Sequence, residues 1–129
     1  MYENYLFKEI LMNLVTIILG TMVALEFFFI LYLETFATTS DKTSKVFNME
    51  KEELERKSVK TLFKNQGVYN GLLAVLILLS IYVFKNKMEV TVLMSYIILV
   101  AIYGGITSNP KIIFKQGGLA ILTLISTFF

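Results

Sequence analysis

The sequence predicts an all-α, polytopic membrane protein, with a bundle of four transmembrane helices and a short surface helix in the first loop. Three observations predict this class. Of the 129 residues, 56% are hydrophobic, more than the surface of a soluble domain of this size would accommodate. Four segments are apolar over about the 20 residues that a bilayer crossing requires. Most charged residues collect between the first two segments. We therefore expect a single integral membrane domain, residues 1–129.

The apolar segments define four predicted helices, at about residues 10–33, 66–84, 89–107 and 112–129. The links Lys85–Lys87 and Ser108–Lys111 are short, so the helices that they join must be antiparallel. Pro110 suits the first turn of the fourth helix, where its missing N–H costs nothing. The first segment is expected to be retained, because the residues before it lack the positive region of a cleaved signal.

The first loop, at about residues 35–64, holds most of the charge. Asn48 is a candidate N-cap for a short helix, and Glu50, Glu52 and Glu53 would lie favourably near the positive end of that helix. Glu52 and Glu53 each precede a basic residue by four positions, which is the better order for helical ion pairs. We interpret this segment as a surface helix that leads into the second transmembrane helix. A solvated connector is favoured over a docking helix.

Composition excludes several kinds of chemistry. The chain has no cysteine and no histidine. It therefore has no disulfide, no thiolate nucleophile and no imidazole to act as a general base or metal ligand. We predict no cofactor and no metal site. The net charge of +2 is small, and the charges lie outside the apolar segments, so a nucleic-acid partner is not expected. The expected partners are the lipid bilayer and an unidentified small molecule or lipid, and a homo-oligomer is possible.

The distribution of Lys and Arg predicts the orientation, since cytoplasmic loops are enriched in these residues. On the side of the N-terminus and the second loop there are three: Lys8, Lys85 and Lys87. On the side of the first and third loops there are nine: Lys42, Lys45, Lys51, Arg56, Lys57, Lys60, Lys64, Lys111 and Lys115. The prediction is a multi-pass protein of the cell membrane with both termini outside and the first and third loops in the cytoplasm.

Polar residues and glycines collect in the cytoplasmic half of the predicted bundle. The GxxxG at Gly67–Gly71 would allow two membrane helices to approach closely. Polar residues there are often only interhelical hydrogen-bonding groups, but their convergence also suggests a ligand pocket. The candidate ligand-binding residues are Glu26, Gln66, Tyr69, Asn70, Tyr103 and Gln116. Secondary candidates are Tyr32, Glu34, Asn65 and Lys115.

Glu26 is the residue that packing explains least well, because a carboxylate inside a membrane helix is costly unless it is protonated, hydrated or paired. Three arrangements would satisfy it. Glu26 could pair with Lys115, donate a proton to Asn70 or Gln116 as a neutral acid, or face a hydrated pocket. Glu34 lies eight residues further along, about 12 Å at 1.5 Å per residue. We expect Glu34 to reach water at the cytoplasmic boundary.

Three stretches resemble a known family in their order and spacing: LEFFFILYLETFA, KNQGVYNGLLA and VAIYGGITSNPKIIFKQGGLAIL. They are similar to an uncharacterised family of small bacterial four-helix integral membrane proteins, domain of unknown function 1304. The resemblance implies the four-helix fold and no assigned activity. In that family a histidine usually follows the first glutamate, where this chain has Phe27, and a proline often stands where this chain has Leu119. The positions that match are Glu26, Tyr32, Leu33, Glu34, Phe36, Asn65, Gln66, Gly67, Tyr69, Asn70, Gly71, Tyr103, Gly104, Thr107, Lys111, Gln116 and Gly117.

Three functions remain open at this point. The favoured hypothesis is a membrane protein that binds or transports a small molecule or ion, with transport requiring a homo-oligomer because four helices are few. The alternative is a structural or assembly subunit that docks through the first loop. A membrane enzyme that acts on a lipid, with Glu26 and Glu34 in acid–base roles, is the least supported, because the sequence shows no nucleophile or phosphate-binding motif.

Overall fold

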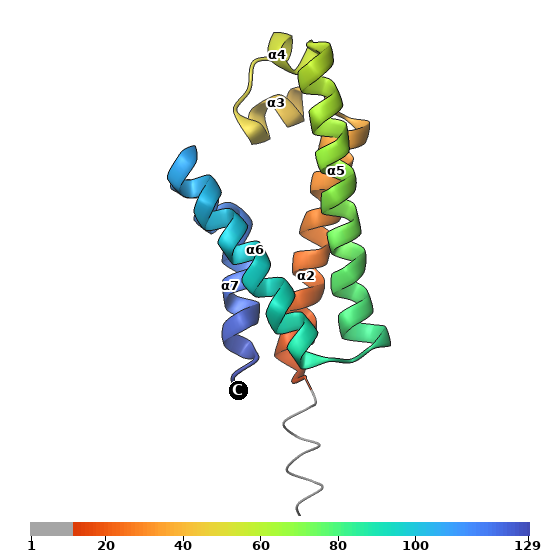
Figure 1. The fold of residues 1–129 in the computed structure, drawn as a ribbon, viewed down its shortest axis with the longest axis vertical. Helices are drawn as coiled ribbons and strands as arrows, with labels where there is room; N and C mark the ends of the chain where they lie inside the picture. The colour runs from red at the N-terminus through yellow and green to blue at the C-terminus, as the bar shows by residue number, and fades with distance from the viewer. Residues whose placement is uncertain (1–11) are drawn as a thin grey trace, which may run out of the picture. The chain divides into compact units, whose positions relative to one another are not determined.

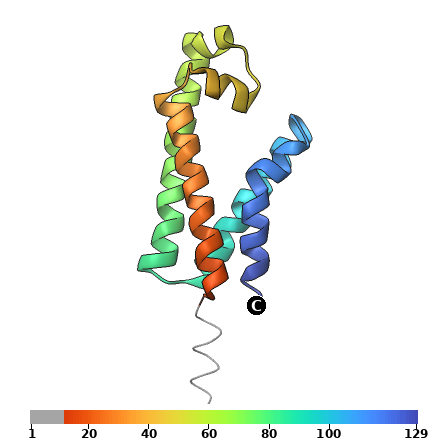
Figure 2. The same ribbon diagram turned by 180° about the vertical axis from the view of Figure 1, so that it is seen from behind.

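The computed structural model describes residues 12–129, and every regular element in that range is helical. The first helix is α2 (Leu14–Leu31), and it continues into a π-helical turn, η1 (Tyr32–Phe36). The first loop follows and contains two short helices, α3 (Asp41–Phe47) and α4 (Lys51–Glu55). The remaining elements are α5 (Lys57–Leu78), a second π-helical turn, η2 (Leu79–Val83), α6 (Lys87–Thr107) and α7 (Lys111–Ser126). Figures 1 and 2 show the ribbon from opposite sides.

Three of the predicted spans are confirmed as helices that are long and apolar enough to cross a membrane. They are Leu14–Phe36, Lys57–Val83 and Lys87–Thr107. The apolar part of α7, Ile113–Ser126, is shorter. At 1.5 Å per residue, the 16 residues of α7 extend about 24 Å, less than the roughly 30 Å of a bilayer core. The structure thus does not confirm the fourth span, and the predicted start at Ile10 lies outside the described residues.

The chain divides into two compact units. One contains residues 24–75, and the other contains residues 12–23 and 76–129. The helices α2 and α5 each continue from one unit into the other. In the unit of residues 24–75, the end of α2 and η1 pack closely against α5 at Gly67 and Gly71. Because these two glycines are the ends of the GxxxG, its predicted role in close helix approach is confirmed.

The second unit is built on the α6–α7 hairpin. Its core includes Met94, Ile97 and Ala120. The first turns of α2 join it through buried hydroxyl groups: the Thr16 and Ser126 Oγ atoms lie 2.7 Å apart. Asn13 Nδ2 also donates to the Ser126 carbonyl at 2.8 Å. These bonds connect the start of α2 to the last turn of α7 within this unit.

The first loop differs from the prediction of one surface helix with Asn48 as its N-cap. Two short helices form instead, and Asn48 is the C-cap of α3, with a left-handed φ of 53°. Asparagine tolerates this conformation better than most residues. Ser40 is the N-cap of α3, and its side chain accepts from the Thr43 N–H. Helix α4 ends at Glu55, because Arg56 adopts an extended backbone. The predicted ion pairs of Glu52 and Glu53 with the basic residues four positions later therefore do not form within one helix.

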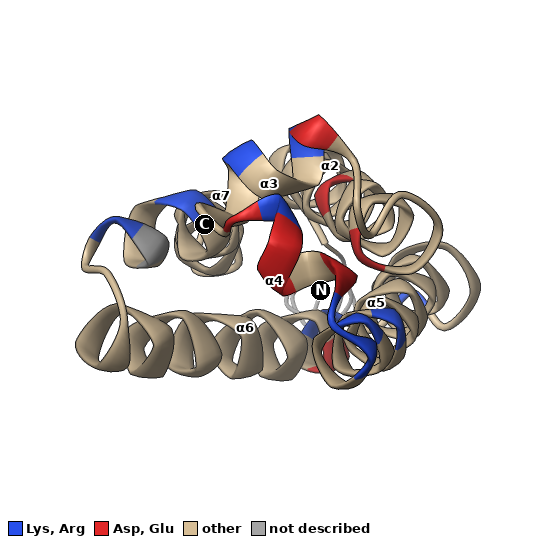
Figure 3. Ribbon diagram, turned by 90° about the horizontal axis from the view of Figure 1, so that it is seen from above, with Lys and Arg blue, Asp and Glu red and all other residues tan. Residues whose placement is uncertain are grey.

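The loop is also more tightly packed than a solvated connector. Thr43 and Leu54 are fully buried. The Phe47 and Phe63 rings meet edge to face at 5.2 Å, and the Lys42 ammonium lies 5.0 Å from the centre of the Phe29 ring. Acidic and basic residues are frequent along α3, α4 and the first turns of α5 (Figure 3), and most of them are exposed. The loop thus forms a charged cap with its own small core.

Candidate ligand site

The site is centred on a buried acid–amide pair. Glu34 lies in η1 and is only 3% exposed. The Asn70 side-chain amide on α5 donates to Glu34 Oε1 at 2.6 Å. This burial contradicts the expectation that Glu34 reaches water. The first loop folds into a packed structure within the same unit, and hydropathy gives no signal for that packing. The burial of Glu34 therefore requires a physical explanation, as the burial of Glu26 does.

Two glycines bring the amide to the acid. A Cβ placed on Gly67 would overlap Thr35 Oγ1 and would lie 3.0 Å from the Thr35 backbone nitrogen. A Cβ on Gly71 would lie 2.6 Å from Leu31 Cδ2. Side chains at these positions would separate the helices. Asn70 lies between the two glycines on α5, so close approach of the backbones lets its short side chain reach Glu34.

The π-helical turn at Glu34 is held by hydroxyl groups from the loop that follows. The Ala37 N–H donates to the Tyr32 carbonyl at 2.9 Å, which is the five-residue spacing of a π-turn. This spacing removes the usual helical partner of the Leu33 carbonyl. Thr43 Oγ1 lies 3.1 Å from that carbonyl and 2.7 Å from the Ala37 carbonyl. Single π-turns in α-helices often occur at functional sites.

Thr38 supplies a further bond by donating its hydroxyl proton to the Glu34 carbonyl at 2.6 Å. Thr35 likewise donates to the Lys64 carbonyl on α5 at 2.9 Å. The three threonines at positions 35, 38 and 43 were not among the predicted site residues. The available signal was the hydroxyl-rich stretch TTSDKTS, residues 38–44, directly after an apolar helix.

Glu26 lies two turns before Glu34 on α2 and is partly buried. Its Oε2 atom is buried and has no hydrogen-bond partner among the described residues. The proposed bond from a neutral Glu26 to Asn70 is not seen, since Asn70 instead binds Glu34. The alternatives that involve Lys115 and Gln116 stay predictions. In this unit, the Glu34 carboxyl group therefore accepts a hydrogen bond, whereas one buried oxygen of the Glu26 carboxyl group has no partner among the described residues.

The other predicted residues are not brought into this pair. Tyr32, Tyr69 and Tyr103 are 55%, 76% and 71% exposed. The remaining exposed candidates are polar or basic side chains on α5 and α7: Asn65, Gln66, Lys115 and Gln116. Tyr103, Lys115 and Gln116 belong to the unit built on α6 and α7, whereas Glu26 and Asn70 belong to the other. The convergence of all six ligand-binding candidates remains a prediction.

The groups available for chemistry in this unit are the carboxyl groups of Glu26 and Glu34 and the side-chain amide of Asn70. A carboxylate accepts hydrogen bonds and attracts cations, and a protonated carboxyl can also donate. Within residues 12–129, no three acidic side chains lie together in a way that could hold a metal ion.

The fold and the site together define a class: an all-helical chain with three helices of membrane-spanning length and a buried acid–amide pair in the first of its helical hairpins. The chain belongs to a family described as protein of unknown function (DUF1304), whose model matches residues 21–128. The expected family membership is thus confirmed.

A relative from Lactococcus lactis subsp. lactis (strain IL1403), described as uncharacterized protein YpaA, is 62% identical over 119 residues. The match covers 92% of this chain and 100% of the relative. No solved structure matches the chain. The relatives therefore place the chain in a family without adding an activity.

Proposed function

We propose that the protein is an integral membrane protein that binds small cations, inorganic or amine-bearing, at the carboxyl groups of Glu26 and Glu34. The observation that carries this proposal is the pair of acids on one apolar helix. Glu34 is buried and accepts a hydrogen bond from the Asn70 amide, and Glu26 has a buried oxygen without a partner among the described residues. Both acids lie within the Leu14–Phe36 segment, which is long and apolar enough to cross a membrane.

The energetics favour a binding role over packing alone. An acid at the centre of a membrane helix costs about 2.5–3.5 kcal/mol on insertion scales. A hydrogen bond between membrane helices contributes only about 0.6–2 kcal/mol. Glu26 lies near the centre of the Leu14–Phe36 segment and has a buried oxygen without a partner among the described residues, so this cost is not offset there. Glu34 lies two residues from the end of the segment and accepts a hydrogen bond from Asn70, so its cost is smaller. A cation bound at Glu26 would supply the partner that its buried oxygen lacks, and a cation at Glu34 would neutralise the charge of that carboxyl group.

A membrane location is supported by the three long apolar helices and by the amount of large apolar side chain that is exposed. Phe36, Ile106 and Phe114 are each more than 75% exposed, whereas soluble monomers rarely leave large apolar patches open to water. The proposed orientation has the first and third loops in the cytoplasm. In a homo-oligomer, exposed candidates such as Gln66 and Tyr69 would be able to face a shared site.

The orientation can be tested with single cysteines, because the natural chain has none. Ser58→Cys in α5, Ser108→Cys after α6 and Met88→Cys at the start of α6 each replace an exposed residue. A membrane-impermeant maleimide applied to intact cells should label only Met88→Cys. Labelling of Ser58→Cys or Ser108→Cys in intact cells would reverse the proposed orientation.

Ligand binding can be tested by thermal unfolding of the purified protein in detergent. Far-UV circular dichroism is the suitable signal, because the chain has neither tryptophan nor cysteine. The probes are sodium, guanidinium and ethylammonium chlorides at matched ionic strength. A ligand at 100 times its Kd stabilises the native state by about 2.7 kcal/mol, so one probe should raise the Tm well above the others.

The control variants separate a specific site from general salt effects. Glu26→Gln and Glu34→Gln should each reduce the shift, while Glu55→Gln, an exposed acid in α4, should preserve it. The proposal is wrong if no probe shifts the Tm, or if the variant that lacks both buried acids responds like the natural chain.

A further inference from the structure

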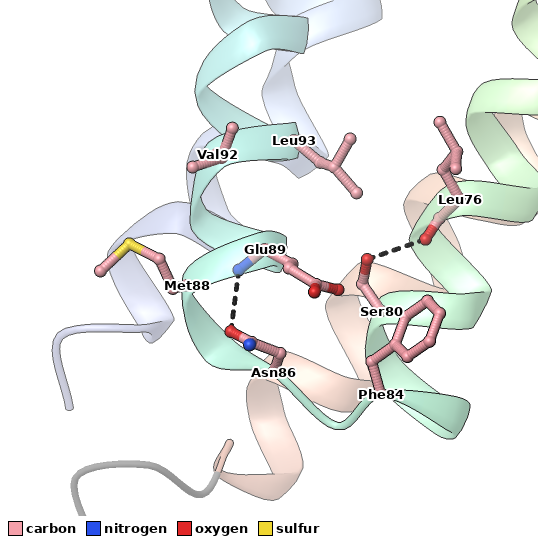
Figure 4. Close-up of a pocket in the computed structure, with 8 residues that line it drawn as sticks. All are labelled: Leu76, Ser80, Phe84, Asn86, Met88, Glu89, Val92 and Leu93. Atoms are coloured by element: carbon pink, nitrogen blue, oxygen red, sulfur yellow. Dashed lines mark hydrogen bonds between the residues drawn. The ribbon is translucent and has the colours of Figure 1, made fainter.

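A second candidate site lies in the hairpin between α5 and α6, entirely within one compact unit. It is an open groove of about 440 Å³ between η2 and the first turns of α6 (Figure 4). This volume lies within the usual range of ligand sites, about 300–1,000 Å³. Most of its wall is apolar, and Leu76, Phe84 and Val92 are all at least half exposed. In a protein embedded in a bilayer, such a wall faces lipid.

One end of the groove is polar. Figure 4 shows the Glu89 carboxyl group directed from α6 toward Ser80, with Leu76 and Leu93 further along the groove. Ser80 is only 4% exposed, and its hydroxyl donates to the Leu76 carbonyl at 2.9 Å. The Ser80 oxygen can therefore still accept a hydrogen bond. Asn86 Oδ1 accepts from the Glu89 N–H at 3.1 Å and is thereby held at the same end.

The local backbone also departs from a regular helix at this point. The Phe84 N–H donates to the Leu79 carbonyl at 2.8 Å, and the Asn86 N–H donates to the Ser80 carbonyl at 3.0 Å. These bonds form a second π-turn and attach the linking residues to it. Such turns are frequent at functional sites. Two basic residues, Lys85 and Lys87, flank Asn86 in the link, so acidic and basic groups occur together at the polar end.

We propose that this groove binds a membrane lipid whose headgroup carries a protonated primary amine. The acyl chain lies along Leu76, Val92 and Leu93, and the ammonium group donates to the Glu89 carboxylate and the Ser80 hydroxyl oxygen. The positive charges of Lys85 and Lys87 complement the lipid phosphate. A primary ammonium has three N–H donors for these acceptors, whereas a choline headgroup has none. This inference rests on the membrane location in the proposed function but not on the Glu26–Glu34 site.

The test uses the full-length chain in phosphatidylcholine vesicles with a trace of photoactivatable lipid. The reactive group is on the acyl chain, and the headgroup is ethanolamine or choline. Mass spectrometry then locates the adducts. The ethanolamine lipid should label residues around Leu76 and Leu93 about tenfold more than the choline lipid, the factor that one hydrogen bond to a charged group gives.

Two variants test the groove and its acid separately. Glu89→Gln should remove the preference for ethanolamine but retain labelling, because glutamine keeps the size of the side chain. Leu93→Trp should reduce labelling by both lipids by filling the groove. Glu55→Gln, which changes an exposed acid in α4, should leave the preference unchanged. Circular dichroism checks that each variant is folded.

Equal labelling by the two lipids, a preference that persists in Glu89→Gln, or adducts spread evenly along the apolar helices would each overturn the inference. Flotation of the vesicles tests the membrane location independently. Protein that does not float with the vesicles would contradict both proposals. Protein that floats but shows no ethanolamine preference contradicts only the lipid site, and the cation site is left to its own assay.

Discussion

The Asn70–Glu34 pair gives the most specific energetic prediction. Asn70→Leu removes the only side-chain hydrogen bond that residues 12–129 give to the Glu34 carboxyl, and Glu34 is 3% exposed. An unsatisfied buried acceptor costs about 1–3 kcal/mol, so Asn70→Leu should destabilise the protein by this amount. Glu34→Leu combined with Asn70→Leu should be much less harmful than Asn70→Leu alone, because no polar group is then left without a partner.

The interaction can be measured with a double-mutant cycle. Unfolding by SDS in mixed micelles, followed by far-UV circular dichroism, gives a free energy of unfolding for each variant. The bond is short and buried, so we expect a coupling energy of about 1–1.5 kcal/mol, near the upper end for bonds between membrane helices. Asn65→Leu on the same helix is the matched control. Asn65 is exposed, and its replacement should change stability by less than about 0.5 kcal/mol.

The reasoning fails if Asn70→Leu and Glu34→Leu are additive within about 0.3–0.5 kcal/mol, the usual range for independent sites. That result would mean that the 2.6 Å contact contributes nothing in a membrane environment. It would also remove the argument that Glu34 is specifically held on α5.

Three other perturbations test other parts of the fold. Gly67→Ala should destabilise by about 1–3 kcal/mol, because its Cβ would meet the Thr35 backbone and side chain. Gly118→Ala should not destabilise in the same unfolding assay, because its Cβ would meet no packing neighbour within 4 Å and alanine is the better helix former. Thr16→Val should cost about 1 kcal/mol by removing a buried hydrogen bond to the last turn of α7, and an unchanged SDS midpoint would contradict this. The hydrogen bond and charge of Lys51 lower the pKa of Asp41. The stability that this exposed ion pair contributes is therefore present above the usual pKa of an aspartate and is lost as the pH falls through the lowered pKa. NMR titration should show a higher Asp41 pKa in Lys51→Ala.

Much of the helical architecture follows from the sequence because an apolar run of the right length is a local property. The span beginning at Lys87 was predicted within two residues of its observed start. The start of α5 was missed by nine residues, since its first turns are polar. Hydropathy predicts which residues can lie in a membrane. Whether a helix extends beyond its apolar residues depends on helix propensity and on the packing of the loop against that helix.

The first loop shows where local patterns are ambiguous. Asn48 is a favourable residue both for an N-cap and for a left-handed C-cap. The structure uses it as a C-cap, and the N-cap is Ser40. The deciding factor is that Thr43, one turn into the helix, bonds to the Leu33 and Ala37 carbonyls. Such a contact between two elements is a tertiary feature that spacing alone does not reveal.

The candidate site was predicted in part. The sequence identified Glu34 and Asn70 as candidates, and it identified the Gly67–Gly71 motif that brings their helices together. It did not identify which acid the amide would bind. Glu26 and Glu34 lie on neighbouring faces of one helix, so the choice depends on the rotation and height of α2 relative to α5. The π-turn at Glu34 changes that rotation, and hydropathy gives no signal for a π-turn.

Native mass spectrometry of protein released gently from its own membranes tests the central claim most directly. We predict that the natural chain retains a small cation or amine, and that Glu55→Gln retains the same species. The variant with both Glu26→Gln and Glu34→Gln should lose it while remaining folded. A bare natural chain, or the same bound species in the double variant, would contradict a cation site at these two acids.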